Sequence, residues 1–169
     1  QDTVVDGAIM DAPLVAQAIG SIFDRQGIKS KAVATALSGH SVIVKPVSLP
    51  LMAEDELYDR VQQEASQHIP FDIADVNLDY QLLETLDSQM NVLLVAVKKD
   101  KILNYTNVLA QAGKTPAVVD IDAFAVQNCY EVNYDPDPGS TVALLNIGAS
   151  VMNINIARGG APLFTRDVS

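Results

Sequence analysis

The succession of expected helices and strands predicts an α/β or α+β fold that contains at least one mixed sheet. Segments with apolar residues at helical spacing alternate with shorter alternating or continuously apolar segments, and Gly or Pro residues separate them. The expected order is helix, strand, strand, helix, strand, strand, helix, strand, helix and three strands. A chain of 169 residues suffices for one domain or for two small ones.

The first helix is expected to follow Asp11, a polar cap residue, with Pro13 near the first helical position and Gly27 as its stop. Its apolar positions recur at helical spacing and are Leu14, Val15, Ala18, Ile19 and Ile22. A strand over residues 31–37 follows this helix.

The second strand, residues 41–49, contains Pro46, which lacks a backbone donor and therefore suggests an edge position or a bulge. The next helix, residues 52–68, is ended by Pro70. Its apolar seam is narrow, with residues four apart at Leu57, Val61 and Ala65.

Two strands come next, an alternating one at 76–84 and a continuously apolar one at 91–97. Asp100 can cap the following helix, which ends before Gly113. The block from residue 41 to residue 113 thus reads strand, helix, strand, strand, helix. Its two helices could cover one face of a three-stranded sheet, so we expect an inserted subdomain here.

A strand at 116–121 leads into a helix over about residues 122–131. This helix is apolar nearly all round, so we expect it to be buried on more than one side, with Cys129 in a core rather than acting as a nucleophile. After a Pro- and Gly-containing turn, three further strands are expected at 142–145, 152–157 and 163–168, the first of them buried.

The charge balance excludes several classes of partner. Acidic residues number 21 against 11 basic ones, a net charge of -10. This balance repels phosphate backbones, so no nucleic-acid function is expected, and it disfavours attachment to anionic lipid through a basic surface. No run of about 18 apolar residues occurs, so no membrane span is expected.

Thiol and imidazole groups are too few and too scattered for a metal site. Cys129 is the only cysteine, which excludes an internal disulfide and suits a reducing compartment. His40 and His68 lack the spacing of a metal pair. No metal ligands are therefore assigned, and no Ser-His-Asp or Cys-His constellation is present that would indicate nucleophilic catalysis.

The turn after the strand at 142–145 is the segment of greatest chemical interest. There an apolar strand delivers Asn146, Gly148, Ala149 and Ser150 into a tight turn. Gly148 permits close backbone approach, and successive amides with the Ser150 hydroxyl could cradle a phosphate. From the local sequence alone, an ordinary hairpin with small turn residues is the favoured interpretation.

A second candidate is the carboxylate pair Asp120 and Asp122 at a strand-to-helix junction. Strand alternation would place both on one side, where they could hold a magnesium-bound or attacking water. The alternative is that Asp122 only caps its helix, and local grounds favour this cap.

Several motifs together give the chain a family resemblance. It resembles the PilM family of type IV pilus assembly proteins, which is related to the actin-like cell-division protein FtsA. The resemblance covers essentially the whole chain, and its most specific part is the stretch from Glu64 to Tyr80, which contains Ile69-Pro70-Phe71 and Val76-Asn77-Leu78-Asp79-Tyr80. The other matching segments are residues 5–9, 36–39, 42–44, 49–52, 92–96, 112–113, 119–123, 146–150 and 164–167.

The resemblance implies a partial actin-like, ribonuclease H-like lobe with an inserted strand-helix-strand-strand-helix subdomain of the SHS2 type. The expected divisions are 1–40 for the first part of the lobe, 41–115 for the insertion and 116–169 for the remainder of the lobe. A first phosphate loop is then expected before Gln1, and a second lobe after Ser169.

In function, the resemblance implies a cytoplasmic scaffold, peripheral to the bacterial inner membrane, in the type IV pilus assembly machine. Such a scaffold would bind the short N-terminal tail of a PilN-like inner-membrane protein and contact other pilus platform and motor proteins. In the full-length protein it would also bind ATP with Mg²⁺, with little or no hydrolysis.

The resemblance also assigns nucleotide-binding positions. Residues Asn146 to Ser150 take the place of the family's second phosphate loop, and Asp122 falls near the expected metal-bound water. The superfamily's loop normally opens with Asp, so Asn146 removes one charge for holding hydrated magnesium. Two alternatives stay open: an ATPase or kinase of the actin-like superfamily, and the cytoplasmic domain of a type II secretion platform protein.

Overall fold

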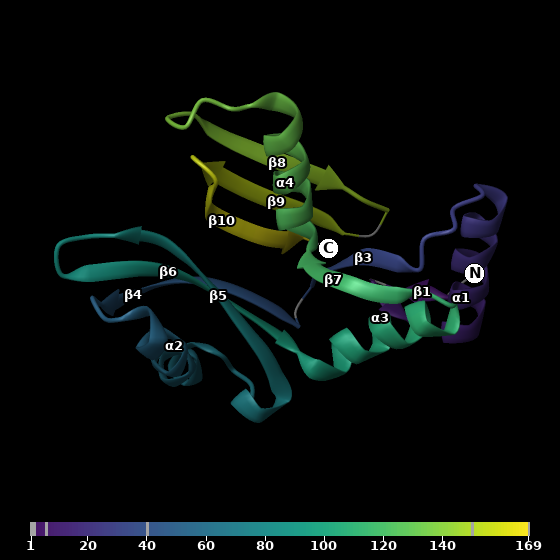
Figure 1. Cartoon of the computed structure of the whole chain (residues 1–169), viewed down its shortest axis with the longest axis horizontal. Coiled ribbons are helices and arrows are strands. Elements are labelled where there is room, and N and C mark those ends of the chain that lie inside the picture. Colours follow the sequence, from purple (N-terminus) through teal and green to yellow (C-terminus); the bar gives the residue numbers. More distant parts are fainter. Residues whose placement is uncertain (1–2, 6, 40, 150, 169) are drawn as a thin grey trace. The chain divides into compact units, whose positions relative to one another are not determined.

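The computed structural model describes residues 3–5, 7–39, 41–149 and 151–168. The chain divides into two compact units, which we call unit 1 (Gln1–Gly39 with Ile102–Ser169) and unit 2 (His40–Lys101) (Figure 1). The helices are α1 (Ala12–Arg25), α2 (Glu54–His68), the 3-10 helix η1 (Ile73–Asp75), α3 (Lys99–Gln111) and α4 (Asp122–Tyr134). The strands are β1 (Val4–Val5), β2 (Ala8–Ile9), β3 (Ala32–Leu37), β4 (Val42–Pro50), β5 (Val76–Thr85), β6 (Gln89–Lys98), β7 (Thr115–Ile121), β8 (Thr141–Ile147), β9 (Met152–Arg158) and β10 (Ala161–Val168).

Unit 2 is built on an antiparallel three-stranded sheet in the order β4-β6-β5. Most side chains of β6 are buried, on both faces of the strand, which accounts for its largely apolar sequence. Pro46 lies on the edge strand β4, opposite Leu93 and without a register shift. The edge position predicted from Pro46 is therefore confirmed, since a proline there costs no ladder bond on the open side.

The core of unit 2 lies between α2 and one face of its sheet. The seam predicted on α2 is buried, and it packs against Leu49, Val92 and Leu94 from β4 and β6. Leu57 and Val61 each contribute about 1.5–3 kcal/mol by leaving water. Two helices were expected on this face. Among the described residues, the helical members of the cluster come from α2, Ile73 of η1 packs against it, and α3 contributes none.

In unit 1 two separate sheets occur besides the short β1-β2 pair. Strands β3 and β7 pair in parallel, and β8, β9 and β10 form an antiparallel meander. Helix α4 contacts β8 and β9, so it packs on the meander. Every sheet in the described residues is purely parallel or purely antiparallel, so the expected mixed sheet is not observed.

Helix α1 begins and ends as its sequence predicts. Asp11 is the N-cap, and its carboxylate accepts a hydrogen bond of 3.0 Å from the Leu14 amide. Pro13 stands in the first turn, where no intrahelical amide donor is needed. Gly27 follows with φ of 66°, a left-handed conformation that glycine adopts without strain.

Burial in the second half of unit 1 differs from the expectation. Only Ala123 and Gln127 of α4 are buried, and Val132 is 86% exposed. Cys129 is exposed as well, so its assignment to a core is wrong. The strand β8 was expected to be buried, yet Leu145 is exposed, because α4 packs on the face of β8 that carries Leu144 and Leu145 alternates to the other face.

Two further differences concern element boundaries. Helix α3 begins at Lys99, so Asp100 lies inside its first turn and is not the cap. Unit 2 ends at Lys101 within α3, whereas the insertion was expected to extend to residue 115. The assignment of 1–40, 41–115 and 116–169 to lobe and insertion stays a prediction.

Candidate functional site

The turn between β8 and β9 contains the candidate phosphate loop. Ile147 and Met152 form the last pair of the two strands, and the Gly148 amide donates to the Val151 carbonyl at 3.0 Å. A Cβ on Gly148 would lie 2.8 Å from that carbonyl oxygen, so the turn requires glycine. The segment is thus a hairpin, as the local sequence favoured, and the Gly148 amide is already used within it.

Ala149 and Ser150 complete the candidate turn. Ala149 is exposed at the tip, whereas Ser150 lies outside the described residues, so its proposed phosphate contact is not placed. The small side chains leave the turn's backbone accessible to a ligand.

Asn146 belongs to a chain of side-chain hydrogen bonds across the meander. At the end of β8, its Nδ2 donates to Asn153 Oδ1 at 2.8 Å. Asn153, 4% exposed on β9, donates through Nδ2 to Asp167 Oδ1 at 2.7 Å. The second oxygen of Asp167 accepts the Gly39 amide, just after β3. Asn146 and Gly39, which are 107 positions apart in the sequence, are therefore connected through the side chains of Asn153 and Asp167.

A second buried amide group lies one step along β9. Asn155 is 1% exposed, and its Nδ2 donates to Gln127 Oε1 at 2.8 Å and to the Ala123 carbonyl at 3.2 Å. Gln127 Nε2 in turn donates to Glu131 at 2.8 Å and to the Gly160 carbonyl at 2.9 Å. This group attaches α4 to the meander by paired polar groups, which buried amides require.

The two carboxylates at the start of α4 have different surroundings. The N-cap of α4 is Ile121, which makes no side-chain cap bond, so the interpretation of Asp122 as a cap is wrong. Asp122 is instead the first helical residue, where negative charge is favoured by the helix dipole. Asp120 accepts from the Ile121 amide at 2.8 Å and from Asn128 Nδ2 at 3.3 Å.

Asp122 also acts on a tyrosine that the sequence did not single out. Burial, and secondly the negative charge of Asp122, raise the pKa of Tyr105 above its ordinary value of 10.0. The Tyr105 hydroxyl donates to the Gly7 carbonyl at 2.7 Å. Asp122 and Asn146 thus belong to separate groups of contacts, and no hydrogen bond joins them in the described structure.

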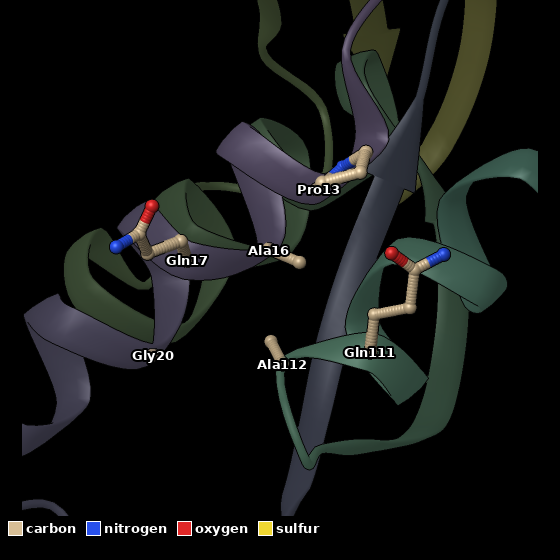
Figure 2. Close-up of a pocket in the computed structure, with 6 residues that line it drawn as sticks. All are labelled: Pro13, Ala16, Gln17, Gly20, Gln111 and Ala112. Carbon is tan, nitrogen blue, oxygen red and sulfur yellow. The ribbon is translucent and has the colours of Figure 1, made fainter.

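The residues that line the crevice between α4 and the meander are small, apolar or amide side chains, and they leave no room for a bound nucleotide. They are Ala123, Val126, Leu144, Asn146, Asn153 and Asn155. A larger hollow of about 500 Å³ lies between α1 and the end of α3 (Figure 2). It is lined by Pro13, Ala16, Gln17, Gly20, Gln111 and Ala112, none of which titrates.

Within 3–5, 7–39, 41–149 and 151–168, no group of three or more His, Cys, Asp or Glu side chains could hold a metal ion. Among these described residues, every helix is too short or too polar to cross a bilayer.

The sequence reasoning missed Asn153, Asn155 and Gln127, although one signal was present. Asn occupies alternate positions of β9, and in the structure these are its inward-facing positions. The strand at 152–157 was predicted, but the alternation of Asn with apolar residues in it does not say which face of the strand is covered. Asp167 entered only as part of a matching segment, and its contact with Gly39 spans 128 residues.

Comparison with known proteins assigns the family. The family model described as "Type IV pilus assembly protein PilM" matches residues 1–169. Among solved structures, the "PilM-PilN type IV pilus biogenesis complex" matches with a TM-score of 0.87 and 28% sequence identity, over 99% of this chain and 51% of that chain. The chain thus spans about half the length of this relative.

A second solved structure shows the same fold at greater distance. It is the cytoplasmic domain of EpsL, an inner membrane component of the type II secretion system of Vibrio cholerae, with a TM-score of 0.61 and 18% identity, over 91% of this chain and 56% of that chain. The mixed α/β structure is consistent with the partial actin-like lobe expected from the sequence. Because its family model spans the whole sequence, the chain belongs to the family of the type IV pilus assembly protein PilM.

Proposed function

We propose that the full-length protein is a scaffold of the type IV pilus assembly machine that binds the short N-terminal tail of a PilN-like inner-membrane protein. The observation that carries this proposal is the match over 99% of the chain to a PilM solved in a complex with PilN. Such a scaffold would lie in the cytoplasm at the inner membrane and contact further platform and motor proteins.

The polar residues near the candidate turn support a scaffold over an enzyme. Asn153, Asn155 and Gln127 are buried amides with hydrogen-bond partners inside unit 1. Asn153 donates to Asp167, and Asn155 donates to Gln127. Amides held in this way stabilise a fixed packing arrangement and are poor proton acceptors. An ATPase or kinase would instead need a general base directed at a water or a substrate hydroxyl.

ATP with Mg²⁺ is part of the proposal for the full-length protein. The β8–β9 turn, with Asn146, Gly148, Ala149 and Ser150, would approach the phosphates, and Asp122 would lie near the metal-bound water. The exposed turn of small residues fits phosphate. The neutral Asn146 fits a hydrated magnesium ion less well than a carboxylate would, so slow or absent hydrolysis is proposed.

The type II secretion alternative is addressed by the comparisons. The EpsL domain shares the fold at 18% identity, and this level of likeness concerns the fold alone. The PilM family model, by contrast, matches residues 1–169. We therefore propose a pilus function rather than a secretion one.

The test is a calorimetric titration of the full-length protein with the N-terminal tail peptide of its PilN-like partner. Saturable binding is expected, and a peptide of the same composition in scrambled order should not bind. If the authentic and scrambled peptides give the same heats, the tail-binding proposal fails. A parallel titration with ATP, with and without Mg²⁺, tests the nucleotide proposal separately.

A further inference from the structure

The hydrogen-bond chain from Asn146 to Gly39 has a fixed polarity. At one end, the Gly39 amide can only donate, and at the centre the ionised carboxylate of Asp167 can only accept. Asn153 must therefore turn its Nδ2 toward Asp167, at 2.7 Å. Its Oδ1 then faces residue 146, which must be a donor, and Asn146 Nδ2 supplies that donor at 2.8 Å.

A carboxylate at position 146 could only accept a hydrogen bond, and it would face Asn153 Oδ1, which is also an acceptor. Asn153 could flip to donate to it, but its Oδ1 would then face Asp167. Either way, Asn153, which is 4% exposed, loses one of its two hydrogen bonds. Because residue 146 itself is exposed, a carboxylate there can turn toward water, but this leaves Asn153 Oδ1 without its donor. Asn153 therefore cannot satisfy Asp167 and a carboxylate at position 146 at the same time.

We propose that Asp167 is a positioning residue that, acting through Asn153, holds an amide donor at position 146 of the candidate nucleotide turn. This assignment rests on the proposed nucleotide function and makes it more specific. A neutral amide adds no negative charge beside a phosphate, so binding of ATP through this turn depends little on a bridging Mg²⁺ ion. Asp167 thereby sets the metal dependence of the site without contacting the ligand.

The polarity between positions 146 and 167 can be reversed by exchanging the residues at these two positions. In the variant carrying both Asn146→Asp and Asp167→Asn, the new amide at 167 accepts from Gly39 and donates to Asn153 Oδ1. Asn153 Nδ2 then donates to the new carboxylate at 146, so every group is paired again. The formal charge of this double variant equals that of the wild type, so a rescue cannot come from net charge.

The experiment is a double-mutant cycle on the melting temperature of the full-length protein. Asn146→Asp alone should lower the melting temperature by about 3–6 °C, the cost of one unsatisfied buried polar contact. In the Asp167→Asn background the same change should cost less than about 1 °C. Equal losses in both backgrounds would overturn the proposed polarity.

A control variant and a folding assay accompany the double-mutant cycle. Asn107→Asp, at an exposed position of α3, gives the general effect of exchanging an amide for a carboxylate. If Asn146→Asp does not fold, recovery of folded protein in the double variant supports the proposal, and failure of the double variant as well contradicts it.

The functional part is read from ATP titrations of wild type and double variant, with Mg²⁺ and with a chelator. The wild type should lose less than about threefold in affinity on removal of Mg²⁺, and the double variant at least tenfold, because its carboxylate then repels the phosphates. Equal losses would refute the role in metal dependence. If the cycle shows the rescue but the wild type binds no ATP in either condition, the nucleotide proposal fails while the hydrogen-bond chain stands.

Discussion

Replacement of Asn155 by Ala tests the buried amide group that attaches α4 to the meander. The side chain is 1% exposed and donates to Gln127 Oε1 and to the Ala123 carbonyl. Its removal leaves Gln127 Oε1 without this donor in a buried position. The Ala123 carbonyl is less affected because it lies in the first turn of a helix, where it can still accept a backbone bond.

The expected magnitude combines two costs. A buried acceptor left unsatisfied costs about 1–3 kcal/mol. The lost packing of the side chain adds about 1 kcal/mol, since the surrounding structure closes only part of the space. Asn155→Ala should therefore lower the free energy of unfolding by about 2–4 kcal/mol, and the melting temperature by roughly 5–10 °C.

The assay is thermal unfolding of the full-length protein followed by circular dichroism. Asn77→Ala is the matched control, because it makes the same exchange at an exposed strand position of β5 and should change the melting temperature by less than about 2 °C. If Asn155→Ala behaves like this control, the amide group contributes no net stability, and the proposed attachment of α4 is wrong.

Other substitutions test separate parts of the structure. Gly148→Ala, which places a Cβ 2.8 Å from a backbone oxygen, should lower the melting temperature by several degrees, whereas Gly139→Ala, whose nearest neighbour would lie at 3.6 Å, should not. Leu94→Ala, at a position 0% exposed, should cost about 2–5 kcal/mol in urea unfolding. Asp122→Asn should lower the pKa of Tyr105, seen as tyrosinate absorbance appearing at lower pH, because it removes the second cause of the raised value. Since that pKa is raised in the folded state, stability from neutral Tyr105 should be lost only as the pH rises above about 10.

Local signals predicted the elements of this fold well. The cap at Asp11, the glycine at Gly27 and the proline at Pro70 fix where helices begin or end, because they act within a few residues of themselves. The continuous apolar run at 91–97 predicted the strand β6, most of whose side chains are buried. These features need no knowledge of distant contacts.

Burial was predicted poorly where it depends on distant partners. The composition of α4 suggests a helix covered on several sides, yet Val132 is 86% exposed in the described structure. Composition gives the apolar surface that is available but not what covers it. The exposure of Leu145 and Ile147 on β8 differs from the expectation for the same reason, because the sequence of a strand does not say what packs on each of its faces.

The candidate site was located only in part. The sequence identified the turn at Asn146 and Gly148, whose small residues are a local signal. It could not identify Asp167 as the partner of Gly39, since the two are 128 residues apart and no periodic pattern links them. The direction of each hydrogen bond between Asn146 and Gly39 follows only from the three-dimensional arrangement of donors and acceptors.

The central claim is that the protein captures the tail of a PilN-like membrane partner, and a co-flotation experiment tests it most directly. Vesicles carrying the full-length partner, vesicles carrying the partner without its N-terminal tail, and empty vesicles are each mixed with the full-length protein and floated on a density gradient. The protein should float only with vesicles that carry the intact partner. Equal flotation with the tail-deleted partner, or none with the intact one, would contradict the scaffold function proposed for this chain.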